Sequence, residues 1–171
     1  MSETSHTAAR RRKPVRRKRA LQNGLPYENA TSGKNAIKEI EKNLRAFGAS
    51  SFGAMEQYDT GDLLVQFEWR NLKVNISVSG KGYAAQWLRR HPWSYSMRAT
   101  KQDYERRALE IGKVARYSIL RDWIKGQITA VECGILSFEG AFLGHIMLPS
   151  GETMLDRVEQ EKLLALPPPT H

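Results

Sequence analysis

Hydrophobic residues recur every three or four positions in the stretch from residue 34 to residue 47. The apolar positions that fall on one helical face are Ile37, Ile40, Leu44 and Phe47. Gly48 follows directly, and glycine suits the left-handed conformation that ends many helices. The spacing therefore predicts an amphipathic helix over 34–47 with one face toward a core.

Two later stretches alternate hydrophobic and polar residues instead. Residues 63–69 and 72–78 place β-branched, aliphatic and aromatic side chains at every second position. Arg70-Asn71 lies between them and can form a tight hairpin turn. A weaker strand, about 51–58, precedes this pair. The pattern predicts three antiparallel strands with one apolar face, which the first helix can cover.

The second half of the chain returns to helical spacing. A short helix is predicted over 83–90. Thr100 and Asp103 form a start similar to a capping box for a long helix that ends near Gly134. Ser137 can cap a further helix, whose apolar positions are Phe138, Phe142, Leu143 and Ile146. These two helices together predict a helical hairpin.

The predicted fold class is α+β, with a helix packed on a three-stranded antiparallel sheet and a C-terminal helical hairpin after it. We expect residues 1–31 to be a disordered basic arm and linker, because they lack periodicity. Residues 32–92 would form the α+β unit, and residues 93–166 the hairpin with an appended short helix. Residues 167–171 would be a tail.

Charge is distributed unevenly along the 171 residues, whose formal net charge is +9. Residues 1–20 carry +7 and residues 21–80 carry −1. Residues 81–125 carry +7 again, whereas residues 126–171 carry −4. The positive charge therefore lies in two places, an N-terminal arm and a predicted helical segment. Such an excess indicates partners of opposite charge.

The arm has eight basic residues within ten positions, which are Arg10, Arg11, Arg12, Lys13, Arg16, Arg17, Lys18 and Arg19. Such a run cannot enter a core, because each charge would leave water unpaired. It also repels itself, so we expect an extended arm. Nucleic acid is its commonest polyanionic partner, because each neutralised phosphate releases a condensed counterion. We predict that these eight side chains contact phosphates.

Five basic residues of the helical segment are predicted to join the arm in binding phosphates: Lys81, Arg89, Arg90, Arg106 and Arg107. Aromatic residues lie among them, and exposed aromatics can stack on bases. Tyr104 and Trp123 belong to the apolar stripe of the long helix, so we expect them in the core. The sequence leaves open whether Trp93 and Tyr95 are stacking residues or core residues.

Gly80-Lys81-Gly82 stands between a predicted strand and a predicted helix. It lacks the spacing of a nucleotide-binding phosphate loop and of the dinucleotide fingerprint. Two interpretations remain open. Backbone amides at a helix N-terminus, together with Lys81, can hold a phosphate of nucleic acid, or the segment can be a plain turn.

Catalytic, metal and membrane functions find little support in the sequence. No stretch approaches the length of a membrane span. Cys133 is the single cysteine, which excludes an internal disulfide and a cysteine-rich zinc site. The histidines, including His145, do not stand at ligand spacing from Cys133 or a carboxylate. We therefore expect no catalytic residue, no metal and no cofactor.

The order of elements over 34–90 resembles the double-stranded-RNA-binding domain in topology. In that family the final helix begins with basic residues that contact phosphates, and the nearest counterparts here are Lys81, Arg89 and Arg90. Lys81-Gly82-Tyr83 replaces the lysine pair of the family. The whole chain also resembles the small uncharacterised accessory proteins of bacterial phages and plasmids, although no motif carries that likeness.

These observations predict a non-enzymatic nucleic-acid-binding protein of low sequence specificity, for DNA or RNA. Two other classes stay open. The chain can be a protein-interaction module that inhibits or regulates a nucleic-acid enzyme, or a structural protein of a particle that packages nucleic acid. We expect a cytoplasmic protein, nucleoid-associated in a bacterium or nuclear in a eukaryotic host, without a membrane partner.

Overall fold

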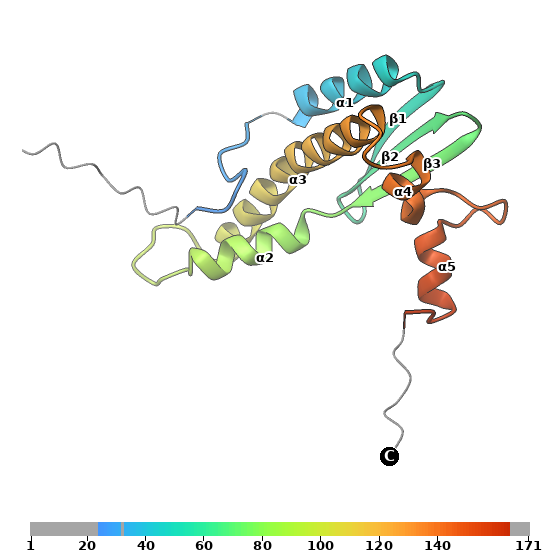
Figure 1. The fold of residues 1–171 in the computed structure, drawn as a ribbon. Helices are drawn as coiled ribbons and strands as arrows, with labels where there is room; N and C mark the ends of the chain where they lie inside the picture. The colour runs from blue at the N-terminus through green and yellow to red at the C-terminus, as the bar shows by residue number, and fades with distance from the viewer. Residues whose placement is uncertain (1–23, 32, 165–171) are drawn as a thin grey trace, which may run out of the picture.

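The computed structural model describes residues 24–31 and 33–164 and has the predicted α+β architecture (Figure 1). The elements in chain order are α1 (Gly33–Phe47), β1 (Ser51–Gln57), β2 (Asp62–Trp69), β3 (Leu72–Val78), α2 (Lys81–Arg90), α3 (Lys101–Glu132), α4 (Phe138–Phe142), a 3₁₀ turn η1 (Leu143–His145) and α5 (Met154–Gln160). In the described part of the chain, no helix is long and apolar enough to cross a membrane.

The sheet is antiparallel throughout, in the order β1-β2-β3. Val65 pairs with Ile76, and Phe67 pairs with Val74, so the alternating apolar residues of β2 and β3 share one face. Arg70 and Asn71 have φ values of 47° and 66°, the left-handed pair that a two-residue hairpin turn requires. The predicted hairpin is therefore confirmed.

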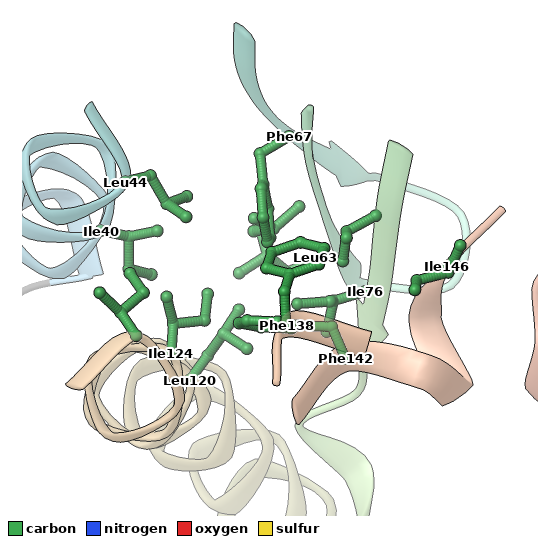
Figure 2. Close-up of a cluster of buried hydrophobic side chains, with 13 residues drawn as sticks. Ile40, Leu44, Leu63, Phe67, Ile76, Leu120, Ile124, Phe138, Phe142 and Ile146 are labelled. Atoms are coloured by element: carbon green, nitrogen blue, oxygen red, sulfur yellow. The ribbon is translucent and has the colours of Figure 1, made fainter. Parts of the chain in front are cut away.

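Helices α1 and α3 lie side by side over this apolar face and build the main core (Figure 1). In Figure 2, Ile40 and Leu44 of α1 point toward Leu120 and Ile124 of α3, and Phe67 approaches from the sheet. All five side chains are buried. The helix predicted over 34–47 covers the sheet together with α3 rather than alone.

The second arm of the predicted helical hairpin is shorter than its apolar spacing indicated. Ser137 caps α4, with its hydroxyl accepting a hydrogen bond from Gly140 N at 2.9 Å. Phe138 and Phe142 are buried in the main core (Figure 2). Ile146 then leaves the helix and forms a β-bridge with Val74. The chain stops being helical there because it pairs with the edge of the sheet.

A second, smaller core joins α2 to the first half of α3. It consists of Ala84, Trp87, Tyr104 and Ala108. The rings of Trp87 and Tyr104 have centroids 5.2 Å apart. Tyr104 is therefore a core residue, as its place in the apolar stripe predicted. The contact holds α2 antiparallel to α3, so the end of α2 and the start of α3 lie together.

Candidate nucleic-acid interface

The connected ends of α2 and α3 place several of the predicted phosphate-binding residues at one end of the molecule. Arg89 and Arg90 occupy the last turn of α2, while Arg106 and Arg107 lie near the start of α3. All four side chains are exposed. Packing of Trp87 on Tyr104 fixes this arrangement, which the sequence spacing alone did not contain.

These arginines differ in how far their charge is compensated. Arg106 forms an ion pair with Asp103, an acidic residue in the first turn of α3. Arg90 donates from Nη1 to the carbonyl oxygen of Gly24 at 3.2 Å and keeps its charge. For Arg89 and Arg107, the described residues supply no ion pair. Arg106 is therefore the weakest of the four as a phosphate ligand.

Arg98 belongs to the same surface, although it was not among the residues predicted to form the site. It lies in the connection between α2 and α3, is exposed, and has no ion-pair partner in the described part of the chain. Its position two residues before the N-cap of α3 is the signal that could have found it. We call Arg89, Arg90, Arg98 and Arg107 the basic end.

Lys81 is not part of the basic end. It begins α2, and the nine steps along the ten-residue helix from Lys81 to Arg90 correspond to about 13 Å. Side-chain hydrogen bonds with Ser79 and Thr60 hold the pKa of Asp62 below its ordinary value, and the positive charges of Lys81 and Arg116 lower it further. Lys81 therefore lies near Asp62, at the opposite end of α2 from Arg89 and Arg90.

Three further cations of α3 are engaged in ion pairs within the fold. Lys113 pairs with Glu110 at 2.9 Å. Arg116 is only 3% exposed, pairs with Glu56 at 2.6 Å and also donates to the carbonyl oxygen of Gly61. Arg121 contacts Glu39 and Asp122, at 3.4 Å and 2.7 Å. These three cations are therefore compensated within the fold, whereas Arg89, Arg98 and Arg107 of the basic end have no ion pair in the described part of the chain.

Residues 24–30 form a turn that is tied to α2, and we call this turn the strap. Glu28 is its centre, because its Oε1 accepts a hydrogen bond from Trp87 Nε1 at 2.7 Å and lies 3.3 Å from His91 Nε2. Tyr83 donates its hydroxyl to the carbonyl oxygen of Pro26 at 2.6 Å. Residues 24–30, which the sequence predicted to be part of a disordered arm and linker, are thus packed against the folded domain.

The strap fixes where the preceding chain reaches the domain. Gly24 receives the hydrogen bond from Arg90, so the strap begins at the basic end (Figure 1). The eight basic residues predicted in the arm, Arg10 to Lys13 and Arg16 to Arg19, lie outside the described residues. Chain connectivity nevertheless means that this run joins the domain beside Arg90.

Residues with catalytic potential lie apart from the basic end. Cys133 is exposed at the C-cap of α3. His145 packs its ring against Trp123, with centroids 5.5 Å apart, and burial lowers its pKa. Across 24–31 and 33–164, the structure contains no group of three or more histidine, cysteine or acidic residues that could hold a metal ion.

An apolar hollow with a volume of about 510 Å³ lies between α1, β1, β2 and α3. Ile37, Ala54, Leu63 and Tyr117 form most of its apolar wall. Neither His145 nor Cys133 lines this hollow.

Comparisons of the chain with models of protein families, with curated proteins and with solved structures find no match.

Proposed function

We propose that this protein binds nucleic acid without catalysing a reaction on it, and with little sequence specificity. The observation that carries the proposal is the basic end, where exposed and uncompensated arginines gather beside the point at which the chain enters the domain. The basic run in residues 10–19 continues from that point along the same chain. Arm and basic end together would present one extended cationic surface.

Phosphate is the chemistry that this surface fits. An arginine guanidinium presents several donors in a planar fork and stays charged at every physiological pH. Arginines that contact phosphates fix position on the backbone and carry no base information, which is the basis of low sequence specificity. If all four arginines of the basic end met phosphates of duplex DNA, they would contribute about −4 to the slope of log affinity against log salt.

A charge-matched pair of variants tests the proposal in the full-length protein. The first variant changes Arg89, Arg98 and Arg107 to glutamine. The control changes three exposed lysines for which the structure gives no ion pair, Lys38, Lys42 and Lys73, also to glutamine. Both lose three charges, but only the first should lose affinity by tenfold or more for duplex DNA, duplex RNA and single strands.

The measurement is a binding titration at several salt concentrations, with equal protein folding confirmed by circular dichroism. Equal losses in both variants would mean that net charge rather than the basic end governs binding. Absence of binding by the wild-type protein at low salt would overturn the proposal altogether.

A protein-interaction module is the second candidate, and the C-terminal segment favours it. Leu155 of α5 is 41% exposed, and Leu163 and Leu164 after it are 62% and 80% exposed. Leu143 of η1, which packs with α5, is 52% exposed. Apolar side chains exposed together are typical of protein-binding surfaces. This candidate would replace the first if wild-type protein fails to bind nucleic acid at low salt.

A further inference from the structure

The connection between α2 and α3 carries two aromatic residues whose status the sequence left open. Tyr95 is 93% exposed. Trp93 is half-buried and packs against the second core. Their ring centroids lie 4.7 Å apart with an interplanar angle of 68°, so the two rings meet edge to face. A fully exposed tyrosine at the tip of a connection buries little apolar surface within the chain.

Local hydrogen bonds organise this connection. Trp93 donates from Nε1 to the carbonyl oxygen of Ala99 at 2.9 Å, which closes the connection into a loop. Met97 N donates to the carbonyl oxygen of Ser94 at 3.0 Å, and the hydroxyls of Ser94 and Ser96 are 3.1 Å apart. Trp93 is therefore fixed by both packing and hydrogen bonding. Tyr95 rests on a fixed neighbour while its ring stays open to solvent.

The charge around this loop suits a nucleic-acid backbone. Arg98 lies within the loop, and Arg89 and Arg107 flank it on α2 and α3. The nearest acidic residues on α3 are Asp103 and Glu105. Asp103 is engaged with Arg106, and Glu105 lies 3.9 Å from Lys101. The exposed tyrosine thus shares its loop with Arg98, and Arg89 and Arg107 lie on the two helices that the loop connects.

We propose that Tyr95 is a stacking platform for an unpaired base, so that the basic end binds single-stranded nucleic acid in preference to duplex. The inference rests on the proposed function and adds its substrate class. An aromatic ring can stack on the face of a base, but in a duplex both faces are covered by neighbouring base pairs. Trp93 orients the ring of Tyr95, and the arginines hold the adjoining phosphates.

The chain offers a matched control for this residue. Tyr58 is also 93% exposed, but it lies in the turn between β1 and β2, next to Asp59. The experiment compares wild-type protein with the full-length variants Tyr95→Ala, Tyr95→Phe and Tyr58→Ala. Each is titrated with a fluorescent oligonucleotide as a single strand and as a duplex of the same sequence, for DNA and for RNA.

Tyr95→Ala should weaken single-strand binding about 5-fold to 100-fold, which is the usual effect of removing one stacking aromatic. Binding of duplex should be unchanged. Tyr95→Phe should keep wild-type affinity, because it keeps the ring and loses only the hydroxyl. Tyr58→Ala should bind both forms as the wild type does. An exposed tyrosine contributes little to the core, so thermal unfolding should be the same for all four proteins.

Three results would overturn the inference, and they are distinct from one another. If the wild type binds nucleic acid and the three-arginine variant binds weakly, while Tyr95→Ala binds single strands normally, the stacking inference fails and the proposed function stands. If the wild type binds neither form, both fail. Loss of single-strand affinity in Tyr58→Ala equal to that in Tyr95→Ala would also overturn it.

Discussion

At the scale of single residues, two glycines decide how α2 joins α3. A Cβ added to Gly112, in the middle of α3, would lie 2.3 Å from the carbonyl oxygen of Gly80. A Cβ on Gly80 would lie 2.8 Å from the backbone of Gly112. The atoms in the way belong to the backbone and cannot rotate aside. Gly80 is thus explained by close packing, which supports the plain-turn interpretation of Gly80-Lys81-Gly82.

Replacement of Gly112 by alanine should therefore destabilise the protein by about 1–3 kcal/mol or more, because backbone must move to admit the methyl group. Gly126, also within α3, has no atom within 4 Å of its added Cβ. Gly126→Ala should instead stabilise by about 0.5–1 kcal/mol, since alanine has the higher helix propensity. Denaturant unfolding of both variants measures the two effects, and a stabilising Gly112→Ala would contradict the packing argument.

His145 gives the fold a pH dependence of predictable sign. Burial against Trp123 lowers its pKa in the folded protein. The unfolded chain therefore binds the proton at higher pH than the folded chain, so the free energy of unfolding falls as pH falls below about 6.5. His145→Gln should remove this part of the decline between pH 7 and pH 5. The measurement is the free energy of unfolding of both proteins at several pH values. An equal decline in both between pH 7 and pH 5 would contradict this prediction.

At the scale of elements, one carboxylate makes the central contacts of the strap. Glu28 accepts hydrogen bonds from Trp87 Nε1 and, at 3.1 Å, from the backbone N of Leu25. Leu25 itself packs against the second core. The Glu28 side chain therefore makes contacts both within the strap and to α2. Removing it should loosen the attachment of the strap to α2.

Glu28→Ala should cost about 2 kcal/mol of folding stability, because a partly buried indole N–H loses a charged acceptor. The control is Glu41, which forms an exposed ion pair with Arg45 on α1. Glu41→Ala should cost about 0.5 kcal/mol of folding stability or less. Hydrogen exchange at residues 25–30 should rise in Glu28→Ala only. Unchanged exchange there would show that the strap is held by other contacts.

At the scale of the whole molecule, the acidic C-terminal segment lies apart from the basic end. Among the acidic residues of 132–161, the ion pairs of the described chain involve only Glu152 and Glu161, both with Arg157. In Figure 1, α5 lies far from the connection between α2 and α3. The acidic C-terminal segment therefore does not neutralise the basic end within one molecule.

The salt dependence of binding should report both cationic parts. If all eight charges of the arm met phosphates of duplex DNA, they would contribute about −7 to the slope of log affinity against log salt. Deleting residues 1–22 should then leave a slope of about −4, from the basic end. The measurement is a duplex DNA titration of both proteins from low to moderate salt. An unchanged slope would show that the arm does not contact the duplex.

Local pattern was sufficient for most of the fold. The helix predicted over 34–47 is observed as Gly33–Phe47, and the strand predicted over 72–78 is observed as Leu72–Val78. Thr100 caps α3 by accepting a hydrogen bond from Asp103 N, as its spacing indicated. These features depend on residues that are close together in the sequence, so periodicity and capping chemistry predict them.

The candidate site depended on contacts between distant residues. Arg106 and Arg107 are neighbours in sequence, yet only Arg106 has a carboxylate partner. Arg116 looks like a surface charge in the sequence but is buried, because Glu56 of β1 and Gly61 of the turn after it are brought to it. No local pattern distinguishes these cases.

By itself, the amino-acid sequence determined the helices and strands, the α+β class and the uneven distribution of charge. The tertiary structure alone decided which positive charges remain available. It did so by packing Trp87 on Tyr104, which gathers arginines from α2, α3 and their connection, and by engaging other cations of α3, such as Lys113 and Arg116, in ion pairs. The reason is physical: charge is set by residue type, but its compensation is set by what lies within a few ångströms in space.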